Sequence, residues 1–147
     1  MERIVVYTDG ACLGNPGPGG WAAVVLDQSG RRELSGFDPA TTNNRMELRA
    51  ALEGLRALPG GAEVHLHTDS QYVRNGMREW LARWKRNGWR TADKKPVKNE
   101  DLWRALDAAA QAHQVHWHWV RGHDGDELNE RCDTLANAAI RQGLSGG

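Results

Sequence analysis

The pattern of polar and apolar positions predicts strands in the first part of the chain. We assign strands to residues 2–12, 20–28 and 31–38, because polar or glycine-rich segments separate these three runs. Residues 14–20 are rich in Gly and Pro and predict a tight loop, whose glycines would let a backbone approach a ligand closely. A turn near residues 28–30 joins the last two runs, so we expect a three-stranded meander.

A helical period begins after this meander. Residues 43–58 carry one apolar stripe, and the segment 59–61, Pro-Gly-Gly, ends it. The stripe consists of Leu48, Ala51, Leu52, Leu55 and Leu58. The later pattern predicts a strand at 63–68, helices at 71–76 and 78–86, a basic loop at 87–98, a helix at 99–112, a strand at 115–120, a loop at 122–125 and a last helix from about 126 to 142.

This order of elements predicts an α/β fold in a single domain spanning residues 1–147. Strands joined through helices pair in parallel, so the expected sheet is mixed and five-stranded, with three antiparallel strands followed by two parallel ones. About five helices should flank it. Ligands of such sheets gather at the carboxyl ends of the parallel strands, where Asp9 and Asp69 lie.

Composition narrows the classes of protein that fit. A run of about 20 apolar residues, as a membrane span needs, is missing, and the chain starts directly in a strand, so we expect neither a membrane anchor nor a signal peptide. Cys12 and Cys132 are too few for a disulfide framework. We therefore expect a cytoplasmic protein. Nothing in the sequence requires an oligomer or an obligate protein partner, so we expect a monomer.

The charge of the chain is unevenly distributed. The 147 residues contain 19 basic and 19 acidic residues, but the segment 78–98 holds eight basic and two acidic ones. This segment therefore carries +6 and the remainder carries −6. A basic patch of this kind suits a polyanion, while the acidic remainder can hold cations.

Four carboxylates lie at the margins of predicted elements: Asp9, Glu47, Asp69 and Asp133. Each has an ordinary explanation, because Asp9 could belong to a turn, Glu47 to a capping box with Asn44, Asp69 to a helix N-cap and Asp133 to a solvated helix face. Helix geometry favours another interpretation. At about 100° per residue, Glu47 and Asp133 both fall at the rim of the apolar face of their helix.

If these four carboxylates converge in the fold, they would suit phosphodiester hydrolysis. Two Mg²⁺ ions about 4 Å apart activate water, neutralise the scissile phosphate and stabilise the leaving oxygen. Mg²⁺ prefers oxygen ligands, and four carboxylates balance the charge of two ions. Without metal, the acids would repel one another and at least one would have a raised pKa.

The basic segment is also rich in tryptophan. Trp80 and Trp84 share one helix face at a spacing of four residues, beside Lys85 and Arg86. The tryptophans could pack their helix onto the body, which we favour for Trp103, or contact nucleic acid, which we favour for Trp84. Binding through such a surface should weaken as salt rises.

Histidines form two further patterns. His123 lies in a glycine-flanked loop, where it could assist proton transfer or product departure, or simply be solvated. His65 and His67 share one face of a predicted strand, as do His116 and His118. Neighbouring strands would cluster these four imidazoles, either as a transition-metal site or as a solvated or helix-covered polar face.

Five blocks of the sequence resemble bacterial type 1 ribonuclease H. They are YTDGACLGNPGPGG at 7–20, TTNNRMEL at 41–48, TDSQYV at 68–73, WKRNGWRTADKKPVKN at 84–99 and NERCD at 129–133. The match runs in order over nearly the whole chain. The resemblance implies the ribonuclease H-like fold and an endonuclease that hydrolyses the RNA strand of RNA–DNA hybrids, leaving 5′-phosphate and 3′-hydroxyl ends.

The resemblance also implies roles for individual residues. It implies two Mg²⁺ ions, for which Mn²⁺ can substitute, bound by Asp9, Glu47, Asp69 and Asp133, with His123 as an auxiliary catalytic group. The region of about 78–98 resembles the basic protrusion of the family. The implied nucleic-acid-binding residues are Asn15, Asn43 and Gln71 in the minor groove, Thr42 and Asn99 at a DNA phosphate, and Trp80, Trp84, Lys85 and Arg86 on the protrusion.

Two other classes of function stay open at this point. Transposase- and integrase-like strand transferases and junction resolvases share an acidic sheet architecture, although the basic protrusion and the pair Asn43 and Gln71 argue against them. A hybrid-binding module without activity is the other alternative, and the intact carboxylates argue against it.

Overall fold

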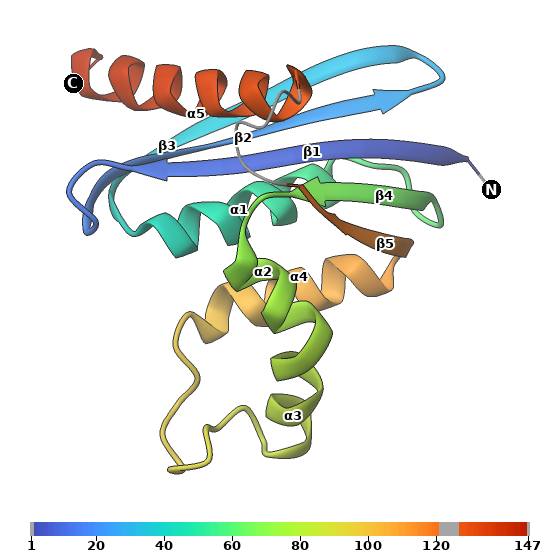
Figure 1. Cartoon of the computed structure of the whole chain (residues 1–147), viewed down its shortest axis with the longest axis vertical. Helices are drawn as coiled ribbons and strands as arrows, with labels where there is room; N and C mark the ends of the chain where they lie inside the picture. The colour runs from blue at the N-terminus through green and yellow to red at the C-terminus, as the bar shows by residue number, and fades with distance from the viewer. Residues whose placement is uncertain (1, 121–126, 147) are drawn as a thin grey trace.

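A five-stranded mixed sheet forms the centre of the molecule. The computed structural model describes residues 2–120 and 127–146 (Figure 1). The sheet has the order β3-β2-β1-β4-β5, with antiparallel pairing among the first three strands and parallel pairing of β1 with β4 and of β4 with β5. This topology confirms the predicted one. The strands are β1 (Arg3–Cys12), β2 (Gly17–Asp27), β3 (Gly30–Thr41), β4 (Glu63–Thr68) and β5 (Gln114–Trp119).

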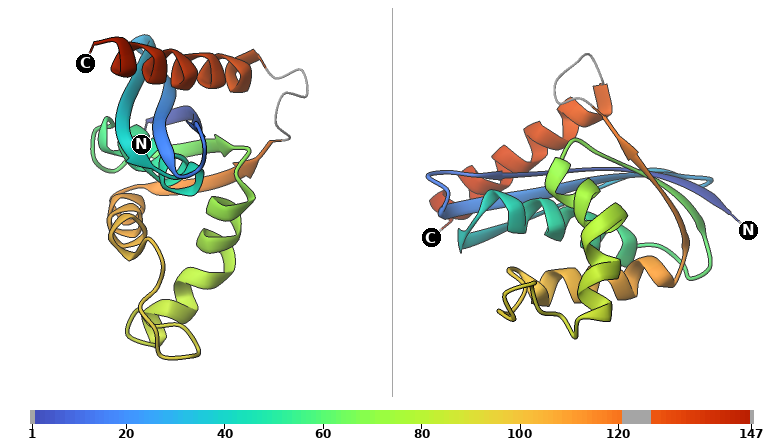
Figure 2. Two further views of the ribbon diagram at one scale, coloured as in Figure 1. Left: turned by 90° about the vertical axis from the view of Figure 1, so that its left-hand side faces the viewer. Right: turned by 60° about the horizontal axis from the view of Figure 1, so that its bottom comes forward.

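Helices cover both faces of this sheet (Figure 2). On one face α1 (Asn43–Arg56) packs against β1 and β2, and α4 (Glu100–Gln111) packs against α1 and β5. On the other face α5 (Glu127–Ser145) packs against β1, β2 and β3. The middle of β2 is therefore buried on both sides, and consecutive apolar residues, 22–25, replace an alternating pattern there.

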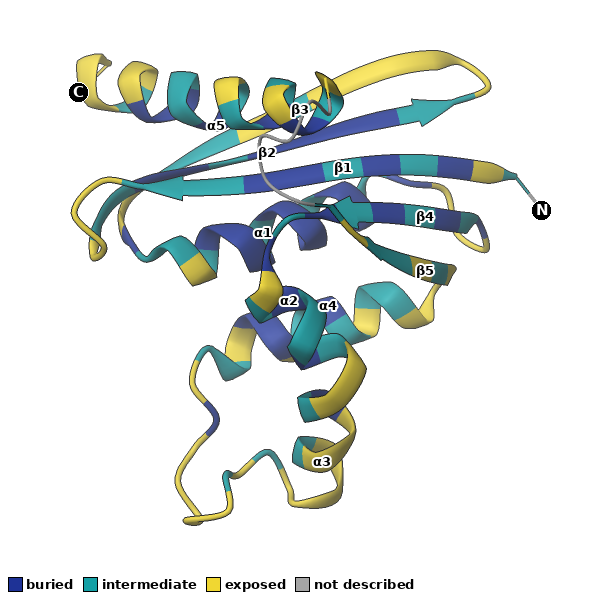
Figure 3. Ribbon diagram, viewed as in Figure 1, coloured by how far each residue is buried: buried dark blue, intermediate teal, exposed yellow. Residues whose placement is uncertain are grey.

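The larger part of the hydrophobic core lies between the sheet and α1 and α4 (Figure 3). It includes Ile4 and Val6 of β1, Val64 and Leu66 of β4, and the apolar stripe of α1 that the sequence predicts. A smaller cluster beneath α5 contains Ala22, Val24, Cys132 and Ala136. Among the described residues, no helix is both long and apolar enough to span a membrane.

One helical run projects away from the sheet (Figure 1). It consists of α2 (Gln71–Asn75), the π-helical turn η1 (Gly76–Trp80) and α3 (Leu81–Arg86), which follow one another without a break. The described residues thus contain four separate helical segments, slightly fewer than the about five that we expected. Gly76 lies against Trp103, and a Cβ at this position would fall 1.9 Å from the indole ring.

The glycine-rich segment differs from its prediction. We expected a loop over 14–20, but β2 already begins at Gly17 and pairs with Thr41 there, so β3 also extends beyond the predicted 38. Added Cβ atoms at Gly19 and Gly20 would lie 2.4 Å from the Thr41 side chain and 2.3 Å from the Ala136 carbonyl oxygen. These two glycines therefore permit close packing within the protein, not the approach of a ligand.

Candidate active site

Three of the four predicted carboxylates converge at the carboxyl end of the parallel strands. Thr8 of β1 and Thr68 of β4 are the last register partners of this pair of strands. Asp9, which still pairs with Ala22 of β2, and Asp69, which follows the end of β4, therefore lie side by side. Glu47 approaches from α1. Ligand oxygens of Asp9, Glu47 and Asp69 all lie within 4.8 Å of one another.

Gly10 makes the approach of Glu47 possible. A Cβ at Gly10 would lie 2.5 Å from the Glu47 backbone nitrogen and 2.5 Å from the Met46 carbonyl carbon. Because only a hydrogen occupies that space, the first turns of α1 can rest directly on β1. Asp9 thus supplies one carboxylate, and the missing side chain of Gly10 leaves the space that allows Glu47 to come close to it.

Two of the ordinary explanations for these acids are wrong. The N-cap of α2 is Ser70, whose Oγ accepts a hydrogen bond from the Val73 backbone nitrogen at 3.1 Å, so Asp69 does not cap this helix. The N-cap of α1 is Thr42, whose Oγ1 accepts from the Arg45 nitrogen at 3.2 Å. A capping box between Asn44 and Glu47 therefore does not form.

The carboxylate cluster is electrostatically unfavourable without a cation. Burial, followed by the charges of Asp69 and Asp133, raises the pKa of Asp9 from 3.8 to about 8. Burial, followed by the charges of Asp9 and Asp69, raises the pKa of Glu47 well above its ordinary value. The expectation that at least one acid has a raised pKa is confirmed.

This donor set fits a hard divalent cation. Asp9 and Glu47 are buried, and Glu47 Oε1 has no hydrogen-bond partner among residues 2–120 and 127–146. A buried carboxylate oxygen with neither a hydrogen bond nor a cation destabilises the folded state. Mg²⁺ prefers oxygen ligands of this kind. The three acids could therefore hold such an ion.

Asp133 lies on α5 at the margin of this cluster. Its charge contributes to the raised pKa of Asp9, and its Oδ1 accepts a hydrogen bond from Asn137 Nδ2 at 3.2 Å. The preceding residue, Cys132, is fully buried, and its thiol donates to the Tyr7 carbonyl oxygen at 3.3 Å. This contact fixes α5 on β1 close to Asp9 and so sets the position of Asp133.

The predicted phosphate-binding residues border a cavity of about 210 Å³. Its lining includes Asn15, Thr42, Lys98 and Asn99. The Asn15 Oδ1 accepts a hydrogen bond from the Asn43 backbone nitrogen at 2.8 Å, which ties the loop after β1 to the start of α1. Gln71, the first residue of α2, is exposed two positions after Asp69.

A hydrogen-bond network that the sequence did not predict supports Asn99. Arg45 donates to both carboxylate oxygens of Asp101, at 3.0 and 2.8 Å, and to Asn99 Oδ1 at 3.2 Å. Asn99 Nδ2 and Trp103 Nε1 each donate to the Tyr72 hydroxyl at 3.0 Å. Three separate elements contribute these residues, so no local spacing in the sequence could reveal the network.

The tryptophans of the protrusion pack against one another. The Trp84 ring lies 5.9 Å from Trp80, 6.3 Å from Trp89 and 5.4 Å from Trp103. Trp103 is fully buried, as predicted, while Trp80 and Trp84 are half-buried. Packing and nucleic-acid contact are thus compatible for Trp84, because part of its surface is still accessible.

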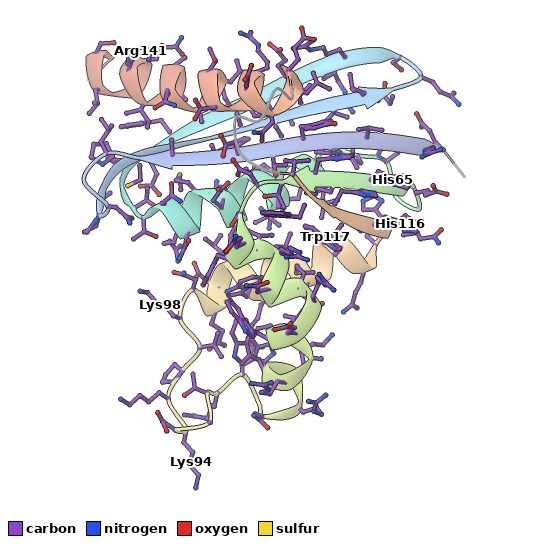
Figure 4. All side chains as sticks on the ribbon, in the orientation of Figure 1. His65, Lys94, Lys98, His116, Trp117 and Arg141 are labelled. Carbon is purple, nitrogen blue, oxygen red and sulfur yellow. The ribbon has the colours of Figure 1, made fainter. Side chains whose placement is uncertain are left out.

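The basic side chains of this region are not equivalent. Lys85 Nζ lies 3.2 Å from Asp107 Oδ2 of α4, so its charge is partly neutralised. Arg86 is exposed, and Lys94 projects from the tip of the loop (Figure 4). The predicted auxiliary residue His123 lies outside the described residues.

The sequence comparisons agree with this geometry. The profile of the RNase H family matches residues 1–141. A curated ribonuclease H of Chelativorans is 60% identical over 140 residues, which cover 95% of this chain and 86% of the relative. A ribonuclease H of Alkalilimnicola ehrlichii is 61% identical over 137 residues, which cover 93% of this chain and 94% of that protein.

Solved structures of ribonucleases H also match this chain in fold. LC9-RNase H1, a type 1 RNase H with the type 2 active-site motif, matches with a TM-score of 0.86 and 37% identity over 96% of this chain and 73% of its own. LC11-RNase H1, solved in complex with an RNA/DNA hybrid, matches with a TM-score of 0.73 and 25% identity over 96% of this chain and 99% of its own.

The mixed sheet, the acidic cluster beside its parallel strands and the family match together define the class of the protein as a nuclease-like hydrolase. The chain belongs to the RNase H family and is an endoribonuclease.

Proposed function

We propose that the protein hydrolyses the RNA strand of RNA–DNA hybrids with two divalent metal ions, leaving 5′-phosphate and 3′-hydroxyl ends. The observation that carries this proposal is the convergence of Asp9, Glu47 and Asp69 within 4.8 Å at a buried site. The relation to LC11-RNase H1, which was solved with an RNA/DNA hybrid, supports the choice of substrate.

In this proposal Asp9, Glu47, Asp69 and Asp133 hold two Mg²⁺ ions, with Mn²⁺ as a substitute. The ions supply charge neutralisation at the scissile phosphate and lower the pKa of water. The carboxyl groups of Asp9 and Glu47 release their protons when the site is loaded, because a nearby cation favours the charged form. His123 assists proton transfer or product departure.

In this proposal the chain is one domain, residues 1–147, with a basic protrusion at about 78–98. The predicted nucleic-acid-binding residues hold the hybrid. Asn15, Asn43 and Gln71 reach the minor groove, whose 2′-hydroxyls mark one strand of a hybrid as RNA. Thr42 and Asn99 bind a phosphate of the DNA strand in the cavity that they line. Trp80, Trp84, Lys85 and Arg86 extend this contact along the protrusion.

Cleavage assays with end-labelled hybrid, duplex DNA and duplex RNA in Mg²⁺, and then in Mn²⁺, test the proposal. We expect cleavage of the hybrid alone, with labels that identify the 5′-phosphate and 3′-hydroxyl ends. Equal cleavage of duplex DNA would favour a strand transferase or resolvase. Tight hybrid binding without cleavage in either metal would favour a binding module.

Two variants on the same helix make the test specific to the site. Glu47→Gln should reduce turnover by at least about a hundredfold, because it removes a metal ligand and not merely an outer contact. Glu53→Gln, six residues further along α1, removes an acid that faces Arg49 and Arg56 and should leave turnover unchanged. Asp9→Asn should likewise abolish cleavage, and His123→Ala should slow it.

A further inference from the structure

A second group of potential metal ligands lies at the opposite end of β4 from the carboxylate cluster. Glu63 is the first residue of β4, whereas Asp69 follows its last. His65 stands two residues after Glu63, on the same face of the strand, and His116 of β5 is its register partner (Figure 4). Ligand atoms of Glu63, His65 and His116 all lie within 4.8 Å of one another.

The imidazoles on this face form an ordered array. His65 stacks on His116 with ring centroids 4.7 Å apart, and His67 stacks on His118 at 4.7 Å. Tyr7 of β1 stacks on His67 at 4.4 Å and also packs against the cluster beneath α5. The histidines therefore share the sheet face that carries α5, beyond the strands on which that helix packs.

Hydrogen bonds fix the orientation of the central imidazole. His65 Nε2 lies 2.8 Å from Glu63 Oε2, and His65 Nδ1 lies 2.8 Å from His118 Nε2. A carboxylate only accepts, so Nε2 of neutral His65 carries its proton, and Nδ1 accepts from His118. Each nitrogen of His65 is thus committed, one toward Glu63 and the other toward His118.

We propose that Glu63, His65 and His116 bind one transition-metal ion, of which Zn²⁺ is the representative, in a site separate from the catalytic carboxylates. Zn²⁺ accepts two imidazole nitrogens, one carboxylate oxygen and an open position for water. The ion takes the place of the proton between His65 Nε2 and Glu63. The proton of neutral His65 then lies on Nδ1, and the proton of neutral His118 lies on its Nδ1. His65 Nδ1–H donates a hydrogen bond to His118 Nε2, which is the outer hydrogen bond that metal-bound histidines require.

The geometry allows this closure with small movements. Tetrahedral bonds of about 2.0–2.1 Å place donor atoms roughly 3.3 Å apart, so atoms within 4.8 Å need only side-chain rotation. His116 is exposed, and Glu63 is only partly buried, so both can rotate. Arg3, at 3.9 Å from Glu63, is a weak competitor for its carboxylate.

The donor types separate this site from the catalytic one. Imidazole suits Zn²⁺, Cu²⁺ and Ni²⁺, whereas Mg²⁺ prefers oxygen. The ion would link the edge strand β5 to β4 through side chains in addition to the backbone ladder. Its binding should therefore stabilise the folded chain in a way that Mg²⁺ does not reproduce.

Zinc titration of the whole chain by calorimetry, in saturating Mg²⁺ to fill the catalytic carboxylates, tests the proposal. We expect one Zn²⁺ ion per chain and a rise in melting temperature. His116→Gln and Glu63→Gln should each weaken zinc binding by at least about tenfold. His67→Gln, on the same face but outside the ligand set, is the matched control and should leave the affinity unchanged.

A spectroscopic readout distinguishes ligation from a general effect on the fold. Co²⁺ bound in place of Zn²⁺ should give visible absorption bands of a nitrogen- and oxygen-ligated tetrahedral ion, and His116→Gln should remove them while circular dichroism stays unchanged. Absence of zinc binding in Mg²⁺, or equal binding by wild type, Glu63→Gln and His116→Gln, would overturn the site. Neither outcome would affect the proposed hybrid cleavage.

Discussion

Asp9 and Asp69 meet because the residues before them, Thr8 and Thr68, are register partners on adjacent parallel strands. The parallel ladder between β1 and β4 ends at this pair, while β1 continues to Cys12 against β2. The two acids therefore lie together at the end of the ladder, although they are far apart in the sequence. Glu47 joins them only because Gly10 leaves room for α1. The site thus depends on one register and one missing side chain.

Gly10→Ala should damage the site without touching a carboxylate. The new Cβ would lie 2.5 Å from two backbone atoms of α1, which cannot rotate away, so α1 must shift and carry Glu47 with it. Overpacking of this kind costs about 1–3 kcal/mol, and we expect that loss in urea denaturation together with reduced cleavage.

Gly60→Ala is the control for this substitution. Nothing lies within 4 Å of a Cβ at Gly60, so both stability and turnover should be preserved. Equal behaviour of the two variants would show that the contact between Gly10 and Glu47 does not position the site.

The metal-free protein should lose stability as pH rises. The pKa of Asp9 is about 8 in the folded chain and 3.8 in the unfolded one, so the folded state binds more protons between these values. Stability is therefore greatest near the lower value, falls as pH rises toward about 8 and levels off above it. The raised pKa of Glu47 acts in the same direction.

Urea denaturation in EDTA at about pH 5.5 and about pH 8, for wild type and Asp9→Asn, checks this dependence. Subtracting the variant cancels histidine titrations that both proteins share. The free energy of unfolding of Asp9→Asn should exceed that of the wild type by more at high pH than at low pH. Mg²⁺ in place of EDTA should make this excess smaller. A difference that does not change with pH would mean that Asp9 is ionised throughout the range.

Arg45→Lys should weaken substrate binding more than turnover. Lysine keeps the charge but lacks the planar guanidinium whose separate nitrogens donate to both oxygens of Asp101 and to Asn99. Asn99 has a left-handed backbone, with φ of 61°, and depends on its neighbours for its orientation. We expect KM for the hybrid to rise severalfold while kcat changes little.

Arg49→Lys is the matched control, because Arg49 lies one turn further along α1 and pairs only with Glu53 among the described ion pairs. It should leave both constants unchanged. A fall in kcat without a change in KM for Arg45→Lys would assign Arg45 to the chemistry and not to the phosphate pocket.

The sequence predicted those features that depend on local periodicity. The strand at 63–68 has the bounds of β4, and the stripe of α1 faces the core as its spacing requires. The boundaries of β2 and β3 were wrong because glycine and proline indicate a loop locally, whereas the ladder between Gly17 and Thr41 forms through the backbone of distant segments.

The same distinction separates the predicted from the unpredicted parts of the site. The four acids could be chosen because each lies near the margin of a predicted element, although β1 continues past Asp9 to Cys12. The support of Asn99 by Arg45 and Tyr72 could not be predicted, since those partners come from separate helices. The pairing of Lys85 with Asp107 was missed for the same reason.

The pairing of Lys85 makes the last prediction specific. Each basic side chain that neutralises a phosphate adds about 0.9 to the slope with which binding weakens as salt rises. Lys85 is held by Asp107 at 3.2 Å, whereas Arg86 and Lys94 are exposed without an ion pair among the described residues. Arg86→Ala and Lys94→Ala should therefore each reduce the slope by about 0.9, whereas Lys85→Ala should change it less.

Binding of a labelled hybrid by the non-cleaving variant Asp9→Asn, measured over a salt series, gives these slopes without interference from hydrolysis. Arg31→Ala, a basic residue paired with Glu33 on β3, controls for a general loss of positive charge and should leave the slope unchanged. If Lys85→Ala reduces the slope as much as either of the other two single replacements, Lys85 must leave Asp107 when the hybrid binds. If none of the three changes it, the hybrid does not contact the protrusion through these side chains.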